Sequence, residues 1–139
     1  MRDVSEIDAS LAAHWAWLVP DDHTPLLLSL FGDWVFGAPD GSLWAISTLE
    51  GVYERIAQSS DEFNQLKQSR EWLDTTFLAS WQEIAQRQGI VPSAHDCITW
   101  RVPPVLGGDF DITNLPLMPQ RVYQSSMSQL HRQRLRYVV

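Results

Sequence analysis

The sequence predicts an α+β fold in which helices pack on a mostly antiparallel sheet. Three observations lead to this class. Apolar residues at the N-terminus recur with helical spacing, three short segments with turn residues between them follow, and further helical patterns then flank another strand pattern. A chain of 139 residues has the length of one domain, which we assign to residues 1–139.

The N-terminal segment, residues 1–23, is predicted to be helical. Pro20 ends the helix, because proline lacks a backbone N–H and fixes φ. We place the helix over residues 4–18, where apolar side chains recur at spacings of three and four: Val4, Ile7, Leu11 and Trp15.

A meander of three antiparallel strands is predicted next, over residues 33–37, 43–48 and 51–56. Asp40-Gly41 separates the first two strands, and Glu50-Gly51 separates the second pair. Glycine suits both turns because it accepts a positive φ without a Cβ clash. This meander has the clearest sequence signals of any part of the chain.

The second half of the chain is predicted to be mainly helical. Asp61 and Glu62 follow a serine cap, as expected for the first turn of a helix, and Gly89 suits a left-handed helix end. The predicted elements are a helix beginning at Ser59 or Ser60, a helix over 72–88, a strand over 97–102, an extended segment within 115–123 and a last helix over 125–135.

The composition limits the classes of partner. Asp and Glu number 17 against 10 Lys and Arg, which gives a formal net charge of −7, and residues 1–63 carry most of the acids. Nucleic-acid binders need basic patches, so we expect no nucleic-acid partner, whereas acidic proteins associate rapidly with basic proteins. No apolar run is long enough to cross a membrane, and the single cysteine, Cys97, fits a reducing cytoplasm.

Two pairs of aspartates are the candidates for catalytic chemistry, and each pair also has a structural explanation. Asp109 and Asp111 could hold a divalent cation in a small metal-dependent enzyme, or simply accept hydrogen bonds in a turn. Asp33 and Asp40 flank a strand with aromatic residues, as carboxylates flank a glycosidase cleft, but both also suit strand ends. We therefore expect no catalytic residue, no metal and no cofactor, and a structural role for Cys97.

Binding is better supported, because aromatic rings among acids are typical of protein interfaces. Packing in the core is the alternative for each ring. The candidate partner-binding residues lie in the acidic half of the chain: Asp21, Asp22, Asp33, Trp34, Asp40, Trp44, Glu50 and Tyr53.

Four stretches together resemble a bacterial protein family. They are PLLLSLFGDWVF at 25–36, PDGSLW at 39–44, PPVLGGDFD at 103–111 followed by Asn114, and QLHRQ at 129–133, and the helix start SDEF at 60–63 adds to them. In this order they are similar to the C-terminal domain of immunity proteins that are paired with DNase effectors of the type VI secretion system. The similarity covers residues 24–134, with Phe110 where the family often has tyrosine.

The resemblance implies a non-catalytic cytoplasmic protein that binds a cognate toxin and occludes its active site, without a cofactor. An acidic surface would suit the basic substrate groove of a nuclease. Two alternatives remain open: a general interaction or regulatory module of the same fold without a toxin partner, and the metal-dependent enzyme with Asp109 and Asp111.

Overall fold

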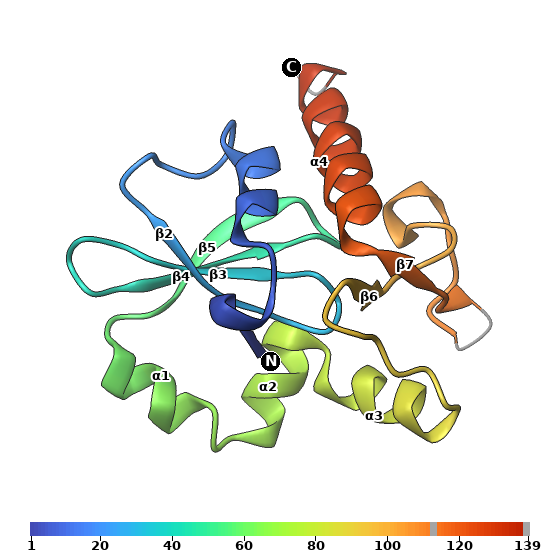
Figure 1. Ribbon diagram of the computed structural model, residues 1–139, viewed down its shortest axis with the longest axis horizontal. Helices are drawn as coiled ribbons and strands as arrows, with labels where there is room; N and C mark the ends of the chain where they lie inside the picture. Colours follow the sequence, from blue (N-terminus) through green and yellow to red (C-terminus); the bar gives the residue numbers. More distant parts are fainter. Residues whose placement is uncertain (112–113, 138–139) are drawn as a thin grey trace.

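The computed structural model describes residues 1–111 and 114–137 and confirms the α+β class. A five-stranded antiparallel sheet in the order β1-β2-β3-β4-β5 lies between two groups of helices (Figure 1). A separate two-stranded antiparallel sheet, β6-β7, is held to the loop after β2, where the Ile98 N–H donates to the Leu30 carbonyl at 2.8 Å. The strands are β1 (Arg2–Asp3), β2 (Thr24–Leu28), β3 (Trp34–Gly37), β4 (Leu43–Ser47), β5 (Val52–Ala57), β6 (Asp96–Ile98) and β7 (Leu117–Pro119).

The predicted meander is confirmed as β3, β4 and β5. Gly41 and Gly51, in its two turns, have φ values of +89° and +74°, which is the conformation that favours glycine. Strand β2 was not predicted. Its run of leucines does not alternate with polar residues and contains no β-branched residue. Pro25 also argues against a strand, because proline cannot donate a hydrogen bond to a neighbouring strand. The sheet accommodates the proline with a shift of register between Pro25 and Leu27.

The predicted α-helix over residues 4–18 is wrong. The segment forms two 3₁₀ helices instead, η1 (Val4–Glu6) and η2 (Ala9–Trp15). Asp3 accepts a hydrogen bond from the Ser5 N–H at 2.9 Å, and Asp8 accepts one from the Ser10 N–H at 3.1 Å. These two local caps divide the segment into short pieces, because an aspartate that binds nearby backbone groups competes with a continuous helix.

The predicted helix start near residue 60 is confirmed. Helix α1 (Ser60–Leu66) has Ser59 as its N-cap, whose hydroxyl accepts a hydrogen bond from the Glu62 N–H at 3.1 Å. Asp61 and Glu62 lie in the first turn, where the helix dipole favours negative charge.

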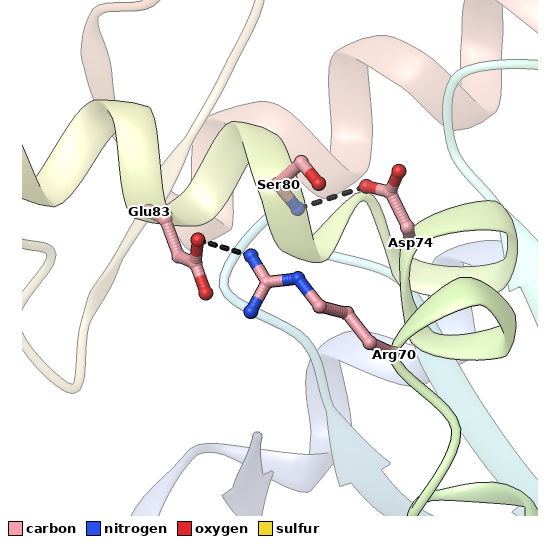
Figure 2. A network of polar contacts seen from close by, with 4 residues as sticks. All are labelled: Arg70, Asp74, Ser80 and Glu83. Atoms are coloured by element: carbon pink, nitrogen blue, oxygen red, sulfur yellow. Dashed lines mark hydrogen bonds and ion pairs between the residues drawn. The ribbon is translucent and has the colours of Figure 1, made fainter.

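The predicted long helix over 72–88 is two helices, α2 (Arg70–Phe77) and α3 (Ala79–Arg87). The chain turns at Leu78, which is left-handed with φ +58°, and the Asp74 carboxylate accepts a hydrogen bond from the Ser80 N–H at 2.8 Å. Figure 2 shows this cap beside the ion pair that joins Arg70 of α2 to Glu83 of α3. The apolar stripe could not reveal the break, because it continues across both helices.

The C-terminal elements differ from the prediction in their bounds. The 97–102 strand is regular only in β6, and a 3₁₀ turn, η3 (Pro104–Leu106), follows it. Beyond β6, the Thr99 N–H still donates to the Pro116 carbonyl at 2.9 Å. Pro116 has no N–H with which to continue the ladder. The extended segment is β7, and the last helix, α4 (Gln120–Tyr137), begins directly after it.

Helices cover both faces of the larger sheet. On one face η2 and α4 enclose a core around Trp15, Trp34 and Ile46, all of which are fully buried. On the other face α1 and α2 pack through Phe63 and Phe77 (Figure 1). A third apolar cluster joins α3, through its buried Ala85, to the segments around β6. Its buried members are Phe31, Ala85, Ile98, Trp100 and Leu115. The β3–β4 turn itself, at Pro39, Asp40 and Gly41, is exposed.

Candidate functional site

Three aromatic side chains meet beside strands β4 and β5. Trp44 of β4 stacks on Tyr53 of β5 with ring centroids 5.5 Å apart, and His23, just before β2, lies 5.5 Å from the Trp44 ring and 5.7 Å from the Tyr53 ring. All three are partly exposed. They therefore combine large apolar area with access from solvent, as anchor residues of interfaces do.

The sheet register places these rings on one face. Phe36 pairs with Trp44 and Ile46 pairs with Tyr53, so their side chains share a face. The buried Phe36 ring meets Tyr53 edge-on at 5.7 Å. The Tyr53 hydroxyl lies 2.6 Å from His23 Nδ1, and burial raises the pKa of Tyr53 above its ordinary value, so the phenol keeps its proton.

Three exposed aspartates and one arginine lie near the rings. The arginine is Arg55, the cross-strand partner of Trp44, and its charge helps to lower the pKa of Asp40. Asp21 and Asp22 directly precede His23 and are exposed. Asp40, in the β3–β4 turn, accepts hydrogen bonds from the Ser42 hydroxyl and from the Ser42 N–H at 2.9 Å, and these bonds lower its pKa. The Ser42 hydroxyl in turn accepts a hydrogen bond from Trp44 Nε1 at 2.9 Å. We call this group the aromatic–acidic surface: Asp21, Asp22, His23, Asp40, Trp44 and Tyr53.

Five of the residues predicted from sequence lie in this surface, and the structure adds His23, which the sequence analysis missed. No sequence signal marked His23, because its neighbours are set by the pairing of β2 with β3. Glu50 is exposed but lies in the β4–β5 turn, at the other end of β4 from Trp44. There it lines a hollow on the surface together with Val52 and Glu54.

Asp33 and Trp34 are buried, with 5% and 0% of their surface exposed. The expectation that they face a partner is therefore corrected. Strand β3 is the middle strand of the sheet and is covered on both faces, so the start of this strand lies inside the molecule. Asp33 and Asp40 also stand at opposite ends of β3, which is not the arrangement of two carboxylates across a cleft.

The buried Asp33 joins the sheet to α4 through Thr48. Its Oδ1 accepts hydrogen bonds from the Thr48 N–H at 2.8 Å and from the Thr48 hydroxyl at 2.7 Å. Thr48 Oγ1 lies 2.9 Å from the Tyr123 hydroxyl, and the Thr48 carbonyl lies 2.7 Å from His131 Nε2, both on α4. Burial raises the pKa of Asp33 to about 6, although the bonds from Thr48 act in the opposite direction.

The raised pKa makes stability depend on pH. The folded state holds the Asp33 proton more tightly than the unfolded chain, where the ordinary value is 3.8. Ionising Asp33 therefore costs stability, and the cost develops as the pH rises from about 4 to about 6. Asparagine does not ionise, so Asp33→Asn avoids this cost. We therefore expect the free energy of unfolding of Asp33→Asn, compared with that of the wild type, to be more favourable at pH 7 than at pH 4, by about 2–3 kcal/mol. Urea unfolding at both pH values measures this difference.

The control for this prediction is Asp40→Asn. Hydrogen bonds lower the pKa of the exposed Asp40, so its ionised form favours folding and the pH effect has the opposite sign. An Asp33→Asn effect of the same size at pH 4 and pH 7 would contradict the prediction.

The loop with Asp109 and Asp111 forms a second hollow, of about 310 Å³. The cationic Arg101 lines it beside the two aspartates. The Asn114 side chain holds the loop, because its Oδ1 accepts from the Val102 N–H at 2.8 Å while its amide donates to the Val102 and Asp109 carbonyls at 2.9 and 2.8 Å. The loop contacts thus give Asn114 a structural role.

His95 and Cys97 differ in exposure, since His95 is exposed and Cys97 is fully buried. Burial raises the pKa of the Cys97 thiol far above its ordinary value, which disfavours the thiolate that a nucleophile requires. Within residues 1–111 and 114–137, no group of three or more His, Cys, Asp or Glu side chains is placed to hold a metal ion.

No family model and no curated protein matches this chain. In the part of the chain that the structure describes, no helix combines the length and the apolar character needed to cross a membrane.

Proposed function

We propose that this chain is a non-catalytic immunity protein that binds and neutralises a cognate toxin in the cytoplasm. The observation that carries the proposal is the aromatic–acidic surface, in which the partly exposed Trp44, Tyr53 and His23 rings lie among Asp21, Asp22 and Asp40. The sequence resemblance to immunity proteins paired with DNase effectors supplies the class of partner.

The chemistry of this surface suits a basic protein. Its three aspartates outnumber the one arginine beside them, Arg55, and the net charge of the chain is −7. A nuclease that binds DNA presents basic side chains in its substrate groove. Charge attraction would speed the encounter, and the aromatic rings would supply apolar burial and cation–π contacts once the two surfaces meet. The same charge opposes nucleic acid as a direct ligand.

The test uses the gene adjacent to the gene for this chain, which under this proposal encodes the toxin. Co-expression of this chain should rescue bacteria that express that toxin, and the two purified proteins should form a stable complex. The association rate should fall as salt is raised, because the salt screens charge attraction. The absence of both rescue and complex formation would exclude the proposal.

The Trp44 side chain is expected to be an energetic anchor. Trp44→Ala should weaken toxin binding by about 2 kcal/mol or more, which is roughly thirtyfold in Kd, because it removes a large ring at the centre of the surface. Isothermal titration calorimetry measures the change.

The matched control is Trp72→Ala. Trp72 is also partly buried, but it packs between Phe63 and Phe77 on the other face of the sheet. It should lower stability and leave toxin affinity unchanged at a temperature where the variant is folded. Equal affinity losses in the two variants would show that Trp44 acts through folding and not through contact.

A further inference from the structure

A hollow of about 270 Å³ adjoins the aromatic–acidic surface. It lies between η2 and the chain leading into β2, both blue in Figure 1. Ala12 and Ala13 of η2 line it together with Phe36 of β3. Asp21 and His23, which belong to the aromatic–acidic surface, also line it. The hollow and the surface are therefore continuous.

The hollow combines an apolar wall with negative charge. The alanines leave space because their side chains end at Cβ, and the acidic residue Asp21 is part of the same lining. No lysine or arginine is among the described residues that line it. An apolar occupant would leave the charge of Asp21 without a partner, whereas a basic occupant would supply one. A second copy of this acidic chain would bring like charges together.

We propose that this hollow receives one arginine side chain from the partner protein. The aliphatic stem would pack against the alanines and Phe36, as the stems of long basic side chains do on apolar surfaces. The guanidinium would pair with the Asp21 carboxylate and stack near the His23 ring, a combination that arginine makes better than lysine. This inference rests on the proposed function and specifies its chemistry.

The test needs no toxin. N-acetyl-arginine amide is titrated into the ¹⁵N-labelled protein, with N-acetyl-citrulline amide as the neutral probe of the same shape and with ionic strength held constant. We expect saturable chemical-shift changes at Ala12, Ala13, Asp21 and His23 with the arginine probe. The citrulline probe should cause changes at least about fivefold weaker at equal concentration, because it lacks the charge.

Two variants separate shape from charge. Ala13→Trp fills the hollow from the exposed side of η2, and Asp21→Asn removes the charge while keeping the shape. Each should weaken binding of the arginine probe by about fivefold or more. The controls are Ala94→Trp, at an exposed alanine beside a different hollow, and Asp61→Asn, at an exposed aspartate on α1. Both controls should bind the probe like the wild type.

The outcomes are distinct from those of the toxin experiment. Equal shifts with arginine and citrulline, shifts outside the hollow, or unchanged binding by Ala13→Trp would overturn the inference. If Trp44→Ala weakens the toxin complex while Ala13→Trp does not, the proposed function stands and this inference fails. If the arginine probe binds as expected but no toxin complex forms, the proposed function fails and the hollow remains an arginine-binding site.

Discussion

Gly108→Ala is expected to destabilise the protein by about 3 kcal/mol or more, one of the largest effects of any single substitution in this chain. A Cβ at position 108 would lie 1.7 Å from the Val102 carbonyl oxygen, far inside van der Waals contact. That oxygen belongs to the backbone and accepts a hydrogen bond from the Asn114 amide at 2.9 Å, so it cannot move without breaking the bonds that hold the loop. Urea unfolding measures the loss.

The neighbouring glycine provides the control. Gly107 has a φ of +92°, but a Cβ there would meet no atom within 4 Å. Gly107→Ala should therefore cost only the strain of a left-handed residue, roughly 1–2 kcal/mol. Gly108→Ala acts through a steric clash instead. The prediction would be contradicted if Gly108→Ala proved no less stable than Gly107→Ala.

The parts of the fold that were predicted correctly are those with local signals. Gly41 and Gly51 mark the meander turns, and Ser59 marks the start of α1, because each acts on residues close to it in sequence. The parts predicted wrongly are those whose backbone conformation has no local marker in the sequence. The break between α2 and α3 at Leu78 is an example. Leucine rarely adopts a positive φ, and the spacing of apolar residues does not indicate that the helix ends there.

The candidate site shows a similar limit. Trp34 and Trp44 both lie on acidic, strand-like segments, and both side chains face the same side of the sheet, since Trp34 and Phe36 share a face and Phe36 pairs with Trp44. Trp34 is nevertheless fully buried and Trp44 is partly exposed. The difference arises from η2 and α4, which pack over the Trp34 end of that face. Residue type and local sequence made both tryptophans candidates for a binding surface. Their different exposure depends on tertiary packing, which the local sequence does not indicate.

Gln124→Leu is the second substitution expected to have a large effect. Gln124 of α4 is fully buried, and its Oε1 accepts a hydrogen bond from Trp15 Nε1 at 2.7 Å. Its amide donates to the Gly32 carbonyl at 2.9 Å and to Gln120 Oε1 at 3.0 Å. One side chain thus joins η2, the β2–β3 turn and α4. Leucine has a comparable size but leaves these partners without a hydrogen bond, at an expected cost of about 3 kcal/mol or more.

The same substitution at Gln129 tests whether the hydrogen bonds are the cause. Gln129 lies on α4 as well, but it is exposed, and its amide donates to the Ser125 hydroxyl at 3.1 Å. Gln129→Leu should change the free energy of unfolding by less than about 0.5 kcal/mol. A double-mutant cycle with Trp15→Phe then isolates the indole contact, because phenylalanine has no N–H to leave unpaired. If the cost of Gln124→Leu is as large in the Trp15→Phe background as in the wild type, the Trp15 bond contributes nothing, and the lost bonds to Gly32 and Gln120 must account for the whole effect.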